Sequence, residues 1–395
     1  MDRTKSRRGE LSAADKRIQR SRAAEKRSED ELKVAREFKI ESTVYNESIP
    51  ELSYRRRKGE VKNTVKWGQR KLALSTIQFF TLYWNPKEIP KPVCVYVGAA
   101  PGYTINVMKI LFPDIEWHLY DSAHFNRKLP KENVTIYNRY FENEDIKTWT
   151  DKNIFFISDI RDPEYQMCFS EDLIVKPSVD ANGTRRKLNK YDCDKVVLRD
   201  MLLQQKWVYE INPKAAHLKF RPPWAGDRYK DGKAIFPYLQ GHAYFQPWLG
   251  PSSTETRLVP VRNESGNYYS VNWDAQKFED KLFYHNSMAR NVYKYINPYT
   301  GDNSHIDGME LTDDWDSLFE ATILSQYLEK VGSANTLENV QKLSRLLTNT
   351  LNDVCPEGSV ARSLKDLRLG TNGEEDITEP IIKVSSGTIK IPIKK

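Results

Sequence analysis

A short run of small residues between an apolar segment and a helix is the first feature of this sequence that can bind a ligand. The run is Gly98-Ala-Ala-Pro-Gly102, and it follows the apolar residues 93–97. Its glycines allow a tight turn close to a ligand, and its alanines leave space beside it. Asp121 closes the next expected strand, nineteen residues after Gly102, where a carboxylate can accept both hydroxyls of a ribose. The pattern predicts an adenosine-type ligand.

Two ligand classes fit this layout, a dinucleotide and S-adenosylmethionine. Dinucleotides are usually bound by Gly-x-Gly-x-x-Gly, which this loop lacks. The form Gly-x-x-Pro-Gly, with its rigid Pro101, favours the methyl donor. A purely structural turn is the remaining alternative.

Two lysines and two carboxylates are candidates for the reacting side chains. Lys71 opens an amphipathic helix, Asp159 ends a strand, Lys219 lies near the end of another, and Glu255 begins a further one. Each alone is typical of a solvated surface, but strand ends share one edge of a sheet, so we expect the four to converge. Such a set suits methyl transfer to a ribose hydroxyl, because the enzyme only has to align the hydroxyl and remove its proton. A lysine acts as that base if burial or a second cation lowers its pKa, and no metal is required.

The elements that must hold these residues alternate between strand and helix. Helical spacing occurs over residues 71–84, 104–111 and 194–209, and again from 313 and from 337. Apolar, β-rich runs cover 93–98, 115–121, 134–141, 153–160, 215–220 and 255–261. This order predicts an α/β fold with a mostly parallel central sheet flanked by helices.

Composition excludes several other classes. The chain has 395 residues with 61 Lys and Arg against 54 Asp and Glu, and its 9 Trp, 21 Tyr and 15 Phe can cover a core. The longest run without charge, 234–254, is broken by prolines, and the N-terminus is charged from its second residue, so we expect a soluble protein without a signal peptide. Four cysteines (94, 168, 193 and 355) lie too far apart for a zinc site, which favours a reducing compartment and no metal.

Five motifs in order resemble one family, the poxvirus cap-specific mRNA 2′-O-methyltransferases, whose members also serve as the small subunit of the viral poly(A) polymerase. The motifs are Gly68-Gln-Arg-Lys71, Val97-Gly-Ala-Ala-Pro-Gly102, Ser158-Asp159-Ile-Arg161, Leu218-Lys219-Phe-Arg221 and Ser253-Thr-Glu255-Thr-Arg257, and the resemblance covers roughly residues 50–350. It implies a Rossmann-like methyltransferase fold and a Lys71, Asp159, Lys219 and Glu255 tetrad with Lys219 as the base.

The resemblance also implies a cofactor site. S-adenosylmethionine would be cradled by Gly98, Ala99, Ala100, Pro101 and Gly102, with Asp121 on its ribose and Asp159 nearby. Arg139, Tyr140 and Phe141 would border the adenine. Ser122-Ala123 replaces a Gly-Arg pair usual in the family, so any contact from that arginine is absent.

Cap recognition follows from the same motif positions. Methylation at N7 makes guanine cationic, so it stacks between two aromatic rings and offers its N1 and N2 donors to carboxylates. Trp224 and Tyr54 resemble the rings, with Tyr45 as a rival to Tyr54, and Glu279 and Asp227 resemble the carboxylates. The alternative is that Trp224 and Tyr54 are core aromatics.

The implied function is transfer of a methyl group to the first transcribed nucleotide of 7-methylguanosine-capped mRNA. Its partners would be capped mRNA and a viral poly(A) polymerase catalytic subunit, with no membrane, in the host cytoplasm, its viral factories or the virion of a large DNA virus. The alternatives are a non-catalytic RNA-binding processivity subunit and a ribosomal-RNA 2′-O-methyltransferase. Basic clusters at 55–58 and 185–187 either follow the RNA backbone or form a solvated face.

Three regions are expected. Residues 1–38 carry twelve Lys or Arg and eight Asp or Glu with few large apolar residues, which predicts a flexible tail that is either solvated or a basic arm. Residues 39–356 form the 2′-O-methyltransferase domain, including C-terminal helices over about 313–351. Residues 357–395 form a loose C-terminal tail.

Overall fold

The computed structural model describes residues 34–54, 65–160, 190–223, 234–250, 253–299, 301 and 315–356 of the 395-residue chain. The predicted C-terminal tail and most of the N-terminal one lie outside these residues. Within the predicted N-terminal tail, β1 (Arg36–Glu37) pairs in parallel with β11 (Tyr295–Ile296). Among the described helices, none is long and apolar enough to cross a membrane.

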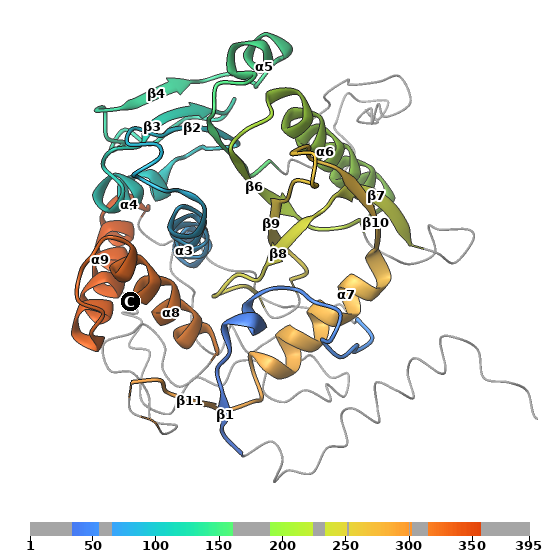
Figure 1. The fold of residues 1–395 in the computed structure, drawn as a ribbon, viewed down its shortest axis with the longest axis vertical. Coiled ribbons are helices and arrows are strands. Elements are labelled where there is room, and N and C mark those ends of the chain that lie inside the picture. The colour runs from blue at the N-terminus through green and yellow to red at the C-terminus, as the bar shows by residue number, and fades with distance from the viewer. Residues whose placement is uncertain are drawn as a thin grey trace, which may run out of the picture.

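A seven-stranded sheet forms the centre, in the order β4-β3-β2-β5-β6-β9-β8 (Figure 1). Its strands in chain order are β2 (Val93–Val97), β3 (Glu116–Tyr120), β4 (Val134–Tyr137), β5 (Phe155–Ser158), β6 (Ala215–Phe220), β8 (Gly241–Tyr244) and β9 (Thr256–Pro260). The five strands from β4 to β6 are parallel, and β9 and β8 join them antiparallel. The prediction of an α/β fold with a mostly parallel sheet and flanking helices is confirmed.

Helices cover the sheet on both sides (Figure 1). On one side lie α3 (Val65–Tyr83), α4 (Tyr103–Leu111), α8 (Trp315–Lys330) and α9 (Leu337–Val354). The other helical elements are α5 (Asn143–Trp149), α6 (Lys190–Ile211), α7 (Ala275–Tyr284), the short 3₁₀ helix η1 (Ile40–Thr43) and the π-helical turn η3 (His285–Ala289). A separate antiparallel pair, β7 (Ile235–Leu239) and β10 (Ser270–Asp274), lies beside α6.

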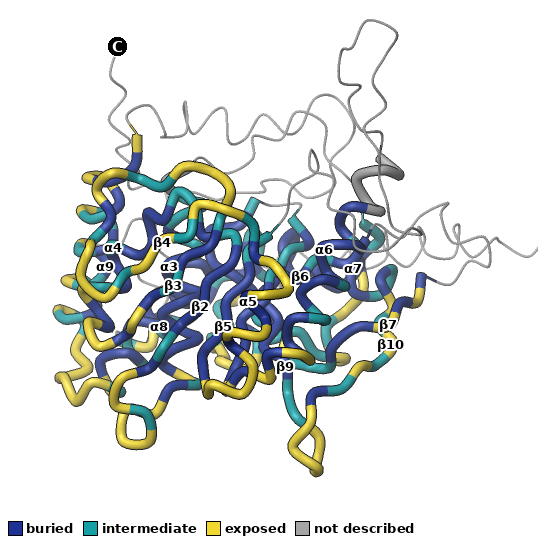
Figure 2. Tube along the Cα trace, turned by 90° about the horizontal axis from the view of Figure 1, so that it is seen from above, coloured by how far each residue is buried: buried dark blue, intermediate teal, exposed yellow. Residues whose placement is uncertain are grey.

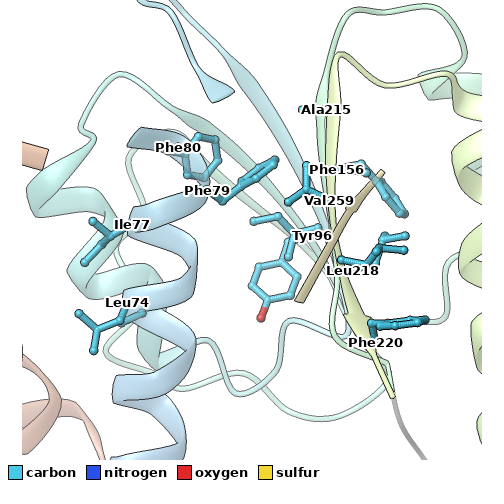
Figure 3. Close-up of a cluster of buried hydrophobic side chains, with 14 of the residues drawn as sticks. Leu74, Ile77, Phe79, Phe80, Tyr96, Phe156, Ala215, Leu218, Phe220 and Val259 are labelled. Carbon is cyan, nitrogen blue, oxygen red and sulfur yellow. The ribbon is translucent and has the colours of Figure 1, made fainter. Parts of the chain in front are cut away.

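The core fills both faces of the sheet. Phe79 of α3 and Tyr96 of β2 lie in the layer between that helix and the sheet, whereas Phe156 and Phe220 lie on the opposite face (Figure 3). Figure 2 shows that the buried residues lie on the strands and that exposed residues are concentrated in the connecting loops. Burial of this apolar surface is the main stabilising contribution to the fold.

Several elements were not predicted, chiefly β7, β8, β10, α5 and α7. Pro237 lies inside β7 and Gly241 begins β8, and both residue types usually mark the end of a strand. A Cβ atom at Gly241 would lie 2.4 Å from the carbonyl oxygen of Val259, so close packing of β8 on β9 demands glycine there. The expected strand over 134–141 is shorter and ends at Tyr137.

Candidate active site

From β2 the successive strands β3 and β4 are added towards one edge of the sheet, whereas β5 and β6 are added towards the other. The strand order therefore reverses between the neighbouring strands β2 and β5, in the middle of the sheet. Their carboxyl ends carry Gly98 and Asp159, and the Asp159 N–H donates to the Val97 carbonyl at 2.9 Å. Gly98 has a φ of +79°, and a Cβ there would lie 2.9 Å from the carbonyl carbon of Asp159. Glycine at position 98 therefore lets the main chain at the end of β2 pack closely against the main chain of Asp159. Open α/β sheets bind ligands at such a switch in strand order.

A cavity of about 270 Å³ opens at this point, just below the range of roughly 300–1,000 Å³ for small-molecule sites. Of the residues predicted to bind the cofactor, those that line it are Gly98, Ala100, Asp121, Arg139, Tyr140, Phe141 and Asp159. Ala99, Pro101 and Gly102 are not among its lining residues. Helix α6 adds a wall that was not predicted, from Arg199, Asp200, Leu203 and Trp207.

Asp121 is held firmly at the edge of the cavity. Its Oδ2 accepts the Ala100 N–H at 2.9 Å, and its Oδ1 accepts the Ala123 N–H at 2.8 Å. A carboxylate oxygen has two lone pairs and can accept more than one hydrogen bond. The predicted role on a ribose is compatible with this geometry.

Arg139 and Phe141 line the cavity and also contact other residues of the protein. The Arg139 guanidinium donates two hydrogen bonds to Asp145, at 2.5 and 2.7 Å, which tie the segment after β4 to α5. The Phe141 ring is buried against Tyr120 and Trp207, with ring centroids 4.9 and 5.2 Å away. Both residues therefore shape the cavity through contacts with their own chain.

The four predicted reacting side chains lie in one ion-paired cluster. The Lys71 Nζ is 2.7 Å from Glu255 Oε1, and the Lys219 Nζ is 3.3 Å from Asp159 Oδ1 and 3.5 Å from Glu255 Oε2. Their side chains are only 12–17% exposed. Asp159 belongs both to this cluster and to the cavity wall, so the two features are continuous.

Helix α3 brings Lys71 to the sheet through a stripe of residues four apart. Lys71, Ser75 and Phe79 share one face of the helix. Phe79 stacks on the buried His217 of β6 with ring centroids 5.1 Å apart, and Ser75 contacts Gln246 at 3.0 Å. The first contact fixes the helix against β6, which carries Lys219, and the second fixes it against the segment after β8; in this position Lys71 reaches Glu255.

Arg257 is the charged residue of this cluster that sequence analysis did not assign. It is 1% exposed, and its guanidinium lies 2.7 Å from Asp159 Oδ1 and 3.4 Å from Glu255 Oε1. In the amide orientation that satisfies its neighbours, Gln246 accepts from Arg257 Nε at 2.9 Å and donates to Glu255 at 3.2 Å. Residues two apart on a strand share a face, so the spacing of Glu255 and Arg257 was a signal for this contact.

The cluster holds three cations against two carboxylates, and its pKa values follow from that balance. Burial lowers the pKa of Lys71, Glu255 opposes this, and Arg257 and Lys219 lower it further. Burial alone would raise the pKa of Glu255, but Lys219, Lys71 and Arg257 together hold that pKa well below its ordinary value. Both carboxylates stay charged at neutral pH, because the pKa of Asp159, raised by burial, is lowered more by Arg257 and Lys219.

The predicted cap-binding residues are only partly within the described residues. Trp224 and Asp227 lie outside them, while Glu279 is buried on α7. Tyr54 reaches the same helix: its N–H donates to Asp280 Oδ1 at 2.9 Å, and its ring meets Phe283 edge-on at 5.4 Å. Tyr45 instead packs on Phe278, 4.7 Å between ring centroids. The structure thus brings both rival tyrosines to α7.

Within the described residues, no group of three His, Cys, Asp or Glu side chains is arranged to hold a metal ion. The basic clusters at 55–58 and 185–187 lie outside the described residues.

The sheet, the cavity at its switch point and the ion-paired cluster define a mixed α/β protein with one continuous polar site. Comparison with known families identifies the chain more closely. A model of the poly(A) polymerase regulatory subunit family matches residues 42–180 and 179–312, more than half of the chain, so the chain belongs to that family. Among curated proteins, no match was found.

Proposed function

We propose that this protein is a cap-specific mRNA 2′-O-methyltransferase that also acts as a poly(A) polymerase regulatory subunit. One observation carries the enzymatic part: Asp159 is shared by an adenosine-sized cavity and by a buried cluster of two lysines and a second carboxylate. A methyl-donor site and a proton-accepting site must adjoin in such an enzyme, because the hydroxyl has to be aligned with the methyl carbon.

The cavity is suited to S-adenosylmethionine. Gly98 and Ala100 line the cavity, Asp121 offers acceptors for a ribose, and Tyr140 and Phe141 offer apolar surface for a base. The strand order, with its reversal between β2 and β5, supports a Rossmann-like methyltransferase fold. When bound, S-adenosylmethionine supplies an electrophilic methyl carbon.

We assign the base role to Lys219. Its amine contacts Asp159, which lines the cavity, whereas the amine of Lys71 contacts Glu255. In this arrangement the Lys219 ammonium first gives up its own proton to solvent, and the resulting neutral amine takes the proton of the 2′-hydroxyl. Asp159 and Glu255 orient this amine, and Lys71 holds Glu255 in place. The near-complete burial of these groups keeps bulk water away from the reacting hydroxyl.

Selection of capped RNA is assigned to the surface around α7. Tyr54 contacts this helix and Glu279 lies on it, while Trp224 and Asp227 follow the end of β6, at Phe220, in the sequence. We propose that the rings of Tyr54 and Trp224 stack on the cationic 7-methylguanine of the cap.

The second role rests on the family match. The matched residues 42–312 include Lys71, Asp159, Lys219 and Glu255, so the ion-paired cluster belongs to the region that defines the family. We propose that the chain binds a poly(A) polymerase catalytic subunit and grips RNA for it, on a surface separate from the cluster.

Methyl transfer from labelled S-adenosylmethionine tests the enzymatic role. Matched RNAs would end in a 7-methylguanosine cap or a plain triphosphate, with Lys219→Ala as the inactive variant and the exposed Lys131→Ala as its control. We expect transfer to the capped RNA alone, lost in Lys219→Ala and retained in Lys131→Ala. Equal transfer to both RNAs would favour a ribosomal-RNA type of enzyme, and no transfer to either would remove the enzymatic role.

Poly(A) tail elongation by the catalytic subunit tests the second role. Both the parent protein and Lys219→Ala should lengthen the tails, because the amine of Lys219 is not needed to grip RNA. An elongation rate that the parent protein leaves unchanged would contradict the regulatory role.

A further inference from the structure

Helix α8 carries two buried carboxylates one turn apart, Asp316 and Glu320. Glu320 is fully buried and Asp316 is 8% exposed. Residues four apart lie on one face of a helix, and α8 lies directly beside α3 (Figure 1). Buried carboxylates are costly unless they are paired, so their partners show what this face of α8 holds in place.

Glu320 binds the helix that carries Lys71. It accepts two bonds from Arg70, one of them from Nε at 2.8 Å, and Arg70 directly precedes Lys71. Ser344 of α9 donates to the same carboxylate at 2.8 Å. The first turns of α3 are therefore anchored to α8 and α9 at the residue next to the reacting lysine.

Glu320 also binds the connection that leads to Glu255. The indole N–H of Trp248 donates to its Oε2 at 2.7 Å. Trp248 has a φ of +62°, a left-handed conformation that a bulky residue adopts only when its surroundings hold it. One carboxylate thus holds both segments that meet in the Lys71–Glu255 ion pair.

Asp316 reaches Glu255 by a second route. It accepts two bonds from Arg290, at 3.0 and 2.6 Å, and Arg290 in turn donates to the Leu249 carbonyl at 3.0 Å and to Asn286 at 2.8 Å.

Asn286 completes this route. Its side chain donates to the carbonyl of Ser253 at 2.5 Å, and the Ser253 hydroxyl accepts the Glu255 N–H at 3.3 Å. Glu320 therefore holds the segments on both sides of this ion pair, and the route from Asp316 adds a second connection to the Glu255 side.

We propose that α8 is a strut that sets the spacing of Lys71 and Glu255, with Glu320 and Asp316 as positioning residues. The inference rests on the proposed methyltransferase function, for which that ion pair orients the reacting groups. Neither carboxylate touches the cluster, so each acts only through the segments that it holds. A displacement of about 1 Å at a reacting group can cost roughly 100-fold in rate, so the rate depends on how firmly these segments are held.

Two variants of Glu320 test the proposal. Glu320→Gln preserves volume but removes the charge, and Glu320→Asp preserves the charge but shortens its reach. The matched control is Glu338→Gln, which changes an exposed carboxylate on the neighbouring α9. Asp316→Asn provides an independent variant of the second route if Glu320→Gln fails to fold.

Steady-state methyl transfer and hydrogen–deuterium exchange are the two measurements. We expect Glu320→Asp and Glu320→Gln to lower kcat at least tenfold, towards the 100-fold scale of a misplaced group, with KM for S-adenosylmethionine within twofold of the parent value. Exchange should rise in peptides covering 67–75 and 246–256 together, and Glu338→Gln should change neither measurement.

The two measurements distinguish a failure of the proposed positioning role of α8 from a failure of the proposed enzymatic function. A parent protein that transfers no methyl group contradicts the proposed function, whereas the exchange pattern still tests the strut. Unchanged kcat and unchanged exchange in both Glu320 variants would overturn the strut. Exchange raised across the whole sheet, with kcat and KM altered alike, would mean general destabilisation and would also overturn it.

Discussion

Lys219 and Arg257 face each other directly across the antiparallel pair of β6 and β9. Like charges at such a position repel each other. Asp159 and Glu255 offset the repulsion, because each carboxylate lies within 3.5 Å of both cations. The sheet therefore holds the Lys219 amine beside a permanent guanidinium charge, and two carboxylates compensate both.

Replacement of Arg257 by methionine should destabilise the fold by about 3–5 kcal/mol, because it removes one partner of a buried ion pair and leaves Asp159 with less compensation. Urea denaturation measures the change. Arg257→Lys keeps a charge and should lose less, and Arg127→Met, at an exposed position, is the control. A loss below about 1 kcal/mol in Arg257→Met, the scale of a surface pair, would contradict the importance of this guanidinium.

Acid should weaken the fold through Glu255. Its native pKa lies well below its ordinary value, while an unfolded glutamate titrates near ~4.3. The stability that Glu255 contributes is therefore complete above about pH 5 and is lost as the pH falls through the native pKa, because the unfolded state binds the proton first.

Urea unfolding from pH 7 down to acid measures this effect. Glu255→Gln should be less stable at neutral pH and should show a flatter dependence of unfolding free energy on pH below about 5, where the lost carboxylate would have titrated. A slope identical to that of the parent protein would count against this assignment.

Loss of the Asp121 carboxylate should weaken binding of S-adenosylmethionine by about 10- to 100-fold, since a hydrogen bond to a charged group contributes roughly 1.5–3 kcal/mol. Asp121→Ala also removes the acceptor of the Ala100 N–H, so the loop itself loses support. Asp121→Asn separates the two effects, and the exposed Asp114→Ala serves as control. Calorimetry that finds equal affinity in Asp121→Ala and the parent would exclude this residue from the cofactor site.

Tyr54 and Tyr45 should respond differently to alanine substitution. If Tyr54 stacks on the cap, Tyr54→Ala weakens binding of capped RNA by about 1–3 kcal/mol and leaves uncapped RNA unaffected. Tyr45 packs on Phe278 and Trp273, so Tyr45→Ala should mainly lower thermal stability. Titration of fluorescent RNAs compares the two variants, and a cap-specific loss in Tyr45→Ala alone would reverse the assignment.

The parallel part of the sheet was predictable because its strands are continuous apolar runs. Residues 215–220 form β6 with the predicted bounds, and α3 begins before Lys71 as an extension of the predicted helix. The antiparallel edge was not predictable by the same signal. Proline in β7 and glycine in β8 usually indicate that a strand ends. In this protein Gly241 instead allows β8 to pack closely against β9.

The convergence of Lys71, Asp159, Lys219 and Glu255 was predictable, because three of them lie at strand ends that share one region of the sheet. Arg257 was not assigned a role because a single arginine in a strand is usually solvated. Its spacing of two residues from Glu255, which places both side chains on one face of the strand, was the only signal that it is buried. The wall from α6 depends on how a helix packs on the sheet, which no local pattern specifies. The roles of the predicted residues remain predictions.

The backbone contact at Gly98 limits how this protein can vary. An added methyl group at residue 98 would have to displace the main chain of Asp159, and the left-handed φ of +79° disfavours every side chain there. In a library of all single substitutions selected for folded protein, we expect this codon to accept glycine alone, whereas neighbouring Ala100 tolerates exchange. The loop beside the cavity is thus fixed at one point by main-chain contact and open to change two residues later.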